Sequence, residues 1–73
     1  MADVPVRSEV AGVVWRVVAA VGGSLAEGDE VVILESMKME LPVLAQSAGV
    51  VSAILVKEGD AVAEGQIVAR LSR

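Results

Sequence analysis

Short apolar runs separated by glycine-containing turns dominate the pattern of the chain. Sixteen of the 73 residues are valine, whose branched side chain packs well on a pleated strand. No stretch combines helical periodicity with capping residues. The pattern therefore predicts an all-β fold. Strands are expected near residues 4–8, 12–19, 30–36, 39–45, 49–56 and 67–72, with short extended pieces near 24–25 and 61–62.

The chain repeats itself at an offset of 37 residues. Residues 12–36 align with residues 49–73 without a gap, and nine of the 25 aligned positions are identical. Two copies are too few for a solenoid, so they predict a closed unit with approximate two-fold symmetry. We expect one domain over residues 1–73, built as a flattened sandwich of two small antiparallel sheets. The residues expected in its core are Val14, Val17, Leu25, Val31, Leu34, Val51, Ile54, Val62, Val68 and Leu71.

The segment between the two copies is where function is expected. It begins with a hairpin of about residues 35–40, and hairpin tips are exposed positions at which function concentrates. Lys38 lies at this tip between Met37 and Met39, the only methionines besides Met1. Methionine suits surfaces that must adapt to a partner. Lys57, by contrast, stands beside Glu58 before a turn and is interpreted as an ordinary solvated charge.

Composition excludes several classes of function. The chain has no cysteine and no histidine, which excludes a disulfide framework, a Cys/His zinc site and imidazole-based catalysis, so we expect no enzyme activity and no metal site. A net charge of −4 and a single aromatic residue, Trp15, argue against nucleic acid and anionic membranes. The longest uncharged run, residues 41–56, is short for a membrane helix. A cytoplasmic protein, monomeric when isolated, is expected.

The Met37-Lys38-Met39 tip, preceded by Glu35, resembles the modification site of the biotinyl/lipoyl attachment domain family. Nearly the whole chain takes part in the resemblance, and its compact length is similar to that of single-domain biotin carboxyl carrier-like proteins. Further matching turns are Gly59-Asp60, Glu27-Gly28 and Glu64-Gly65. The resemblance implies a barrel-sandwich hybrid fold with the modified lysine at the hairpin that joins the halves, about residues 12–36 and 49–73.

The resemblance also implies a function. Lys38 would be biotinylated by a biotin protein ligase and would carry carboxybiotin between a biotin carboxylase and a carboxyltransferase. The residues expected to contribute to ligase recognition are Met37, Met39, Glu35, Ser36 and Glu40. Ser36 departs from the family, in which alanine is commoner two positions before the lysine, and Gly23 stands where aspartate is usual.

Two alternatives to a biotin carrier remain open: a carrier of lipoate, alone or besides biotin, and an unmodified adaptor. Lipoyl domains share the fold but usually place an acidic residue before the lysine and a small one after it, so Met37 and Met39 favour biotin. A lipoyl carrier, or an acceptor of both cofactors, stays an alternative. A third possibility, an unmodified lipoyl-like adaptor, usually lacks the Met-Lys-Met tip.

Overall fold

The computed structural model describes residues 3–73, which form eight strands and no helix. Every predicted strand is present, with its ends within two residues of the expected ones. The strands are β1 (Asp3–Arg7), β2 (Gly12–Val17), β3 (Ser24–Leu25), β4 (Glu30–Ser36), β5 (Met39–Leu44), β6 (Gly49–Ile54), β7 (Ala61–Val62) and β8 (Ile67–Ser72).

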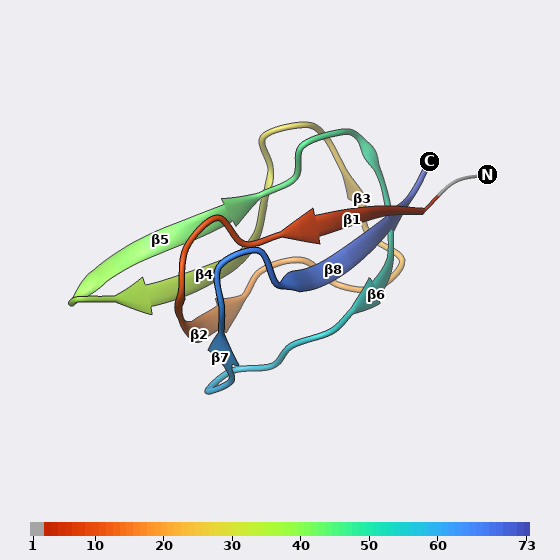
Figure 1. Ribbon diagram of the computed structural model, residues 1–73. Coiled ribbons are helices and arrows are strands. Elements are labelled where there is room, and N and C mark those ends of the chain that lie inside the picture. The colour runs from red at the N-terminus through yellow and green to blue at the C-terminus, as the bar shows by residue number, and fades with distance from the viewer. Residues whose placement is uncertain (1–2) are drawn as a thin grey trace.

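The strands form two four-stranded antiparallel sheets, which confirms the predicted all-β sandwich (Figure 1). One sheet has the order β1-β8-β6-β3 and the other the order β5-β4-β2-β7. Each sheet therefore takes two strands from the first half of the chain and two from the second. The molecule is elongated, with extents of 37 × 18 × 17 Å. The β4–β5 hairpin forms one end, and the described ends of the chain lie at the other (Figure 1).

The strand register extends the repeat beyond the residues that the sequence aligned. β5 pairs with β4 as β1 pairs with β8: Glu40 lies opposite Glu35, just as Asp3, 37 residues earlier, lies opposite Ser72. Pro5 and Pro42 occupy equivalent positions on these two edge strands, where a missing N–H costs no ladder hydrogen bond. The repeated halves are thus residues 3–36 and 40–73, and only residues 37–39 join them.

Apolar side chains between the two sheets form a single core. Of the ten residues predicted to be buried, seven are buried, and Val17, Leu25 and Ile54 are partly buried and packed against them. The additional buried residues that the prediction missed are Val6, Val32, Val43, Ala45, Val56 and Ala69. Val6 and Val43 are equivalent positions on β1 and β5, so they were missed because the repeat was not followed onto those edge strands.

The glycines that begin β2 and β6 have a different role from the one predicted. The recurring glycines were interpreted together as turn residues, but Gly12 and Gly49 lie in strands and neither has a positive φ. A Cβ on Gly12 would lie 2.8 Å from the Glu35 backbone oxygen, and one on Gly49 would lie 2.9 Å from that of Ser72. Glycine is therefore needed here for close approach of neighbouring strands. At Gly12 this brings β2 directly against β4 at Glu35, just below the tip of the β4–β5 hairpin.

The two copies of one turn differ in their side-chain capping, and the difference predicts a stabilising substitution. The Asp60 carboxylate accepts a hydrogen bond of 3.0 Å from the Lys57 backbone N–H, whereas Gly23 at the equivalent position offers no acceptor for the Ala20 N–H. Gly23→Asp should raise the free energy of unfolding by about 1 kcal/mol, through the new hydrogen bond and a less flexible unfolded chain. Urea unfolding measures this.

The reciprocal variant is the matched control for this turn. Asp60→Gly should lose a similar amount of stability, since it converts the second turn into the first. A Cβ at Gly23 would lie 3.0 Å from the Ala20 oxygen. If Gly23→Asp lowers the midpoint of unfolding, that contact outweighs the cap and the two turns are not equivalent.

Candidate functional site

The β4–β5 hairpin ends in a two-residue loop made of Met37 and Lys38. Ser36 and Met39 form the last pair of the ladder, and the two loop residues have φ of 52° and 64°. Positive φ at both central residues defines a type I′ turn, whose twist matches that of two antiparallel strands. The sequence predicted the hairpin, and the structure places Lys38 at its outermost point.

The backbone of this loop is strained. Met37 and Lys38 are the two non-glycine residues with positive φ in residues 3–73, while the other positive-φ positions are glycines. The left-handed conformation costs an ordinary L-residue about 1–2 kcal/mol, and type I′ turns favour asparagine or aspartate followed by glycine. Strain of this kind is concentrated at functional sites. The retained methionine and lysine therefore point to a role that depends on their side chains.

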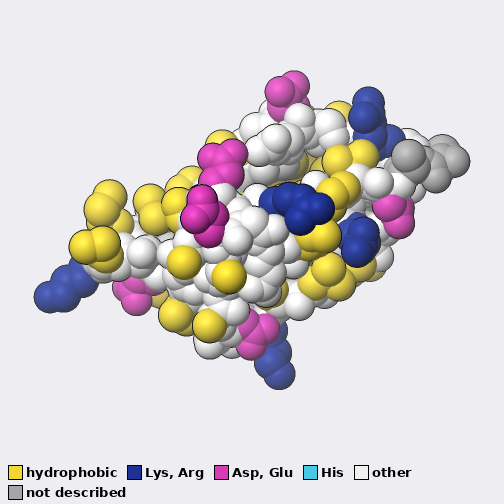
Figure 2. Space-filling view, in the orientation of Figure 1, with side chains coloured by type: hydrophobic (Ala, Val, Ile, Leu, Met, Phe, Trp, Pro, Cys, Tyr) yellow, Lys and Arg dark blue, Asp and Glu magenta, His cyan; other side chains and the backbone are white. Residues whose placement is uncertain are grey.

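The side chains of the tip project into solvent. Met37 is 91 % exposed and Met39 60 % exposed, and Lys38 between them is exposed as well. Within residues 3–73 the Lys38 amine has no hydrogen bond or ion pair. Figure 2 shows hydrophobic and basic side chains together at the end of the molecule that carries the hairpin. A primary amine held in this way is accessible to an acylating enzyme, and the exposed methionines offer that enzyme an apolar contact.

Two glutamates face each other directly below the tip. Glu35 on β4 and Glu40 on β5 are a cross-strand pair, and both are exposed. Like charges in such a pair destabilise a sheet by several tenths of a kcal/mol, about the reverse of an attractive pair. The equivalent pair at the other end, Ser72 with Asp3, carries one acidic residue instead of two. Ser36, the remaining predicted recognition residue, is only partly exposed.

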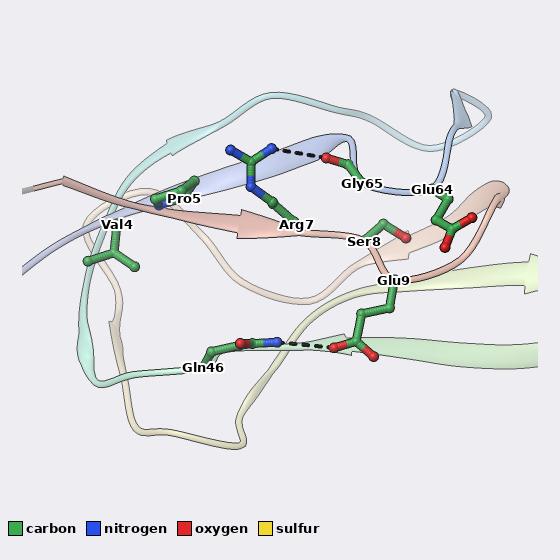
Figure 3. Close-up of a pocket in the computed structure, with 8 residues that line it drawn as sticks. All are labelled: Val4, Pro5, Arg7, Ser8, Glu9, Gln46, Glu64 and Gly65. Atoms are coloured by element: carbon green, nitrogen blue, oxygen red, sulfur yellow. Dashed lines mark hydrogen bonds between the residues drawn. The ribbon is translucent and has the colours of Figure 1, made fainter.

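A shallow groove of about 560 Å³ is lined by β1 and the residues after it, by Gln46 beyond β5 and by Glu64 and Gly65 before β8 (Figure 3). Two polar contacts lie along it: Arg7 donates to the Gly65 carbonyl at 3.1 Å, and Gln46 donates to Glu9 at 3.3 Å. Glu9 and Gln46 are equivalent residues of the two halves, so this contact lies across the approximate two-fold axis. None of the predicted site residues lines the groove.

Within residues 3–73, no group of three or more acidic, histidine or cysteine side chains is arranged to hold a metal ion. No helix in the same residues is long and apolar enough to cross a membrane.

Comparisons with known proteins agree with the fold. The model of the biotin/lipoyl family, described as that of biotin-requiring enzymes, matches residues 2–71. The urea carboxylase of Kluyveromyces lactis is 42 % identical with a TM-score of 0.93, over 99 % of this chain and 6 % of that one. A single-chain, multi-domain long-chain acyl-CoA carboxylase is 31 % identical with a TM-score of 0.89, over 97 % of this chain and 7 % of that one.

A similar fold also occurs in a protein whose name is not that of a carboxylase. An aspartoacylase family protein of Mesorhizobium loti is 26 % identical with a TM-score of 0.79, over 94 % of this chain and 22 % of that one. In all three structures the chain corresponds to a small part of a much longer protein.

The strain at the tip predicts how substitutions there change stability. Met37→Asn should raise the free energy of unfolding by up to about 1 kcal/mol, because asparagine tolerates positive φ. Met37→Val should lower it by about 1 kcal/mol or more, because a branched side chain opposes that conformation. Urea unfolding of both variants gives the two values.

Met39 provides the control, because it lies in the strand rather than in the loop. Valine is favoured over asparagine in strands, so the order of the two substitutions should reverse there. The same order at both positions would contradict the assignment of strain to the loop.

Proposed function

The chain belongs to the biotin/lipoyl family of biotin-requiring enzymes, and on that premise we propose that it is a carrier whose Lys38 is biotinylated by a biotin protein ligase. The observation that carries the proposal is the strained two-residue loop, which holds an unpartnered lysine between two exposed methionines. The family's domains are carriers and not catalysts, and the absence of cysteine and histidine from the sequence fits that role.

The residues at the tip fit covalent attachment. An amide to the carboxylate of biotin needs only an amine that a ligase can reach, and the Lys38 amine is exposed and unpartnered within the described residues. The ligase activates the carboxylate as an acyl-adenylate. The Lys38 amine gives up a proton, attacks the acyl carbon and forms the amide as adenylate leaves with the bond electrons. When attached, biotin supplies a ring that accepts a carboxyl group at one active site and releases it at another.

The sandwich contributes position to this chemistry. The β4–β5 hairpin that carries Lys38 forms one end of a body that is 37 Å long, and the described ends of the chain lie towards the other (Figure 1). The partners are proposed to be a biotin carboxylase and a carboxyltransferase, because the similar structures include two carboxylases of which this fold is a small part. A tethered carrier raises the local concentration of its cofactor at each active site.

Recognition by the ligase is proposed to depend on the side chains around Lys38. Met37 and Met39 flank the lysine in the open, and the Glu35–Glu40 pair lies below it. Both the left-handed backbone and the paired carboxylates cost stability, which fits selection for binding to a partner. Ser36, which closes the ladder opposite Met39 and is partly exposed, is proposed to take part in the same recognition.

Substitution of the two lysines tests the attachment site. Coexpression with a biotin protein ligase should give a product that binds streptavidin, and Lys38→Arg should abolish labelling, because arginine stays protonated and is no nucleophile. Lys57→Arg is the matched control and should label normally. Intact mass confirms a single addition. Labelling that survives Lys38→Arg would contradict the assignment of Lys38 as the attachment site.

Substitution of the two methionines tests the choice of cofactor. Met37→Asp with Met39→Ala imitates the acidic-before, small-after pattern of lipoyl domains. It should cost little stability, because both residues lie at an exposed tip outside the core and exposed substitutions usually change stability by no more than about 0.5 kcal/mol. The ratio of initial labelling rates should move from the biotin ligase towards a lipoate ligase, because a pocket shaped for methionine would have to desolvate a carboxylate.

The control for this change is Met37→Leu with Met39→Leu, which keeps both positions apolar and should keep the preference for biotin. Thermal melts run alongside exclude unfolding as the cause. If the ratio stays constant while the melts agree, the methionines do not select the cofactor, and lipoate becomes an equal candidate.

A further inference from the structure

The outer faces of the two sheets differ at one equivalent row. In the sheet that carries the tip, Pro42 on β5 lies opposite Ile33 on β4, which in turn lies opposite the bulge at Trp15 and Arg16 on β2. The bulge places both of its residues on the outside, because Val14 and Val17 on either side face the core. A row of Pro42, Ile33 and Trp15 thus crosses three strands, with the exposed Arg16 beside Trp15 in the bulge.

In the other sheet the equivalent row has Arg70 and Ser52 where the first has Ile33 and Trp15. There Pro5 lies opposite Arg70, which lies opposite a bulge at Ser52 and Ala53. The Ser52 hydroxyl donates to the Arg70 carbonyl at 3.2 Å. Since serine supports the same bulge in the second copy, the fold does not require tryptophan at position 15.

Trp15 also contributes little to the core. It is 47 % exposed, is the only aromatic residue of the chain, and is not among the residues packed in or against the core. Val13, on the same outer face and opposite Glu35, is 45 % exposed. We call the surface formed by Val13, Trp15, Ile33 and Pro42 the Trp15 face. Exposed tryptophan in an apolar surface is typical of binding sites.

From this asymmetry we propose that the Trp15 face is the second contact of the biotin protein ligase, in addition to the tip itself. This inference rests on the proposed biotinylation of Lys38. Ile33 and Pro42 belong to the same hairpin as Lys38, and four residues of strand place their row about 13 Å from the tip. Val13 and the Glu35–Glu40 pair lie between the two. Tip, acidic pair and Trp15 face therefore form one continuous surface.

The reach of the reacting amine explains why the ligase is the partner. Unmodified Lys38 has only its own four-carbon stem, so the ligase must close over the tip before the amine reaches the adenylate. A carboxylase component works on the much longer biotinyl arm and has no such need to approach the hairpin. The matching ligase surface would have an apolar depression for Trp15 and basic groups opposite Glu35 and Glu40.

The symmetry of the fold supplies a matched pair of variants. Val13 and Val50 are equivalent residues with exposures of 45 % and 44 %, one on each sheet. Val13→Ser and Val50→Ser therefore remove the same side chain from the same setting, but only the first changes the Trp15 face. Trp15→Ser installs the residue that the second copy has at the equivalent position.

The experiment measures biotin transfer to the full 73-residue chain by a purified biotin protein ligase. Trp15→Ser should raise KM about tenfold, as expected for loss of a central tryptophan, and should leave kcat nearly unchanged. Val13→Ser should raise KM a few-fold, and Val50→Ser should leave it unchanged. Thermal melts show whether each variant is folded. If Trp15→Ser does not fold, the KM values of Val13→Ser and Val50→Ser show whether the ligase contacts the Trp15 face.

Several results would overturn the inference. A KM unchanged in Trp15→Ser, or equal effects of Val13→Ser and Val50→Ser, would show that the ligase does not read this face. Wild-type dimerisation in sedimentation that Trp15→Ser abolishes would assign the face to a second copy. Loss of binding to a purified biotin carboxylase, with ligase kinetics intact, would assign it to that component. Failure of wild type to be labelled at Lys38 would instead refute the proposed function.

Discussion

Exchange of strands between the two halves of the chain is the constraint on which the structure depends. β2 and β4 of the first half are completed by β5 and β7 of the second, and β6 and β8 are completed by β1 and β3. Neither half can therefore close its own sheet or bury its own valines. A domain of this size buries only about 60 % of its unfolded surface, and this one has no disulfide to assist. Intertwining makes all of that limited core a single cooperative unit.

The repeated arrangement makes the second copy an internal reference for the first. Positions that are equal in both, such as Gly12 and Gly49, perform the same structural task twice. Positions that differ while the backbone stays the same identify side chains that the fold does not need. Trp15 against Ser52 and Glu35 against Ser72 are such positions, and both first-half residues lie on the sheet that carries Lys38.

The sequence revealed most of the fold because its signals were local. Runs of valine between glycine turns located every strand, and the repeat identified the two-fold arrangement. The edge strands were harder to align, because only Pro5 and Val6 among the residues of β1 recur identically in β5. The exposed lysine at position 38 was also foreseen. Its left-handed backbone was not, because neither methionine nor lysine favours positive φ and no asparagine or glycine signals the turn.

The tip combines features that each lower the stability of the fold. They can coexist because the core of the sandwich stabilises the fold and the tip does not take part in that core. Two left-handed residues, exposed methionines and a pair of facing carboxylates lie within six positions, 35–40. None of these residues belongs to the core. They therefore lower the free energy of unfolding without disturbing the packing that positions the hairpin. A two-residue turn also leaves the lysine little backbone freedom. The sandwich thus supplies rigidity, while the joint between its halves, which has no structural counterpart in the repeat, is free to be specified by recognition alone.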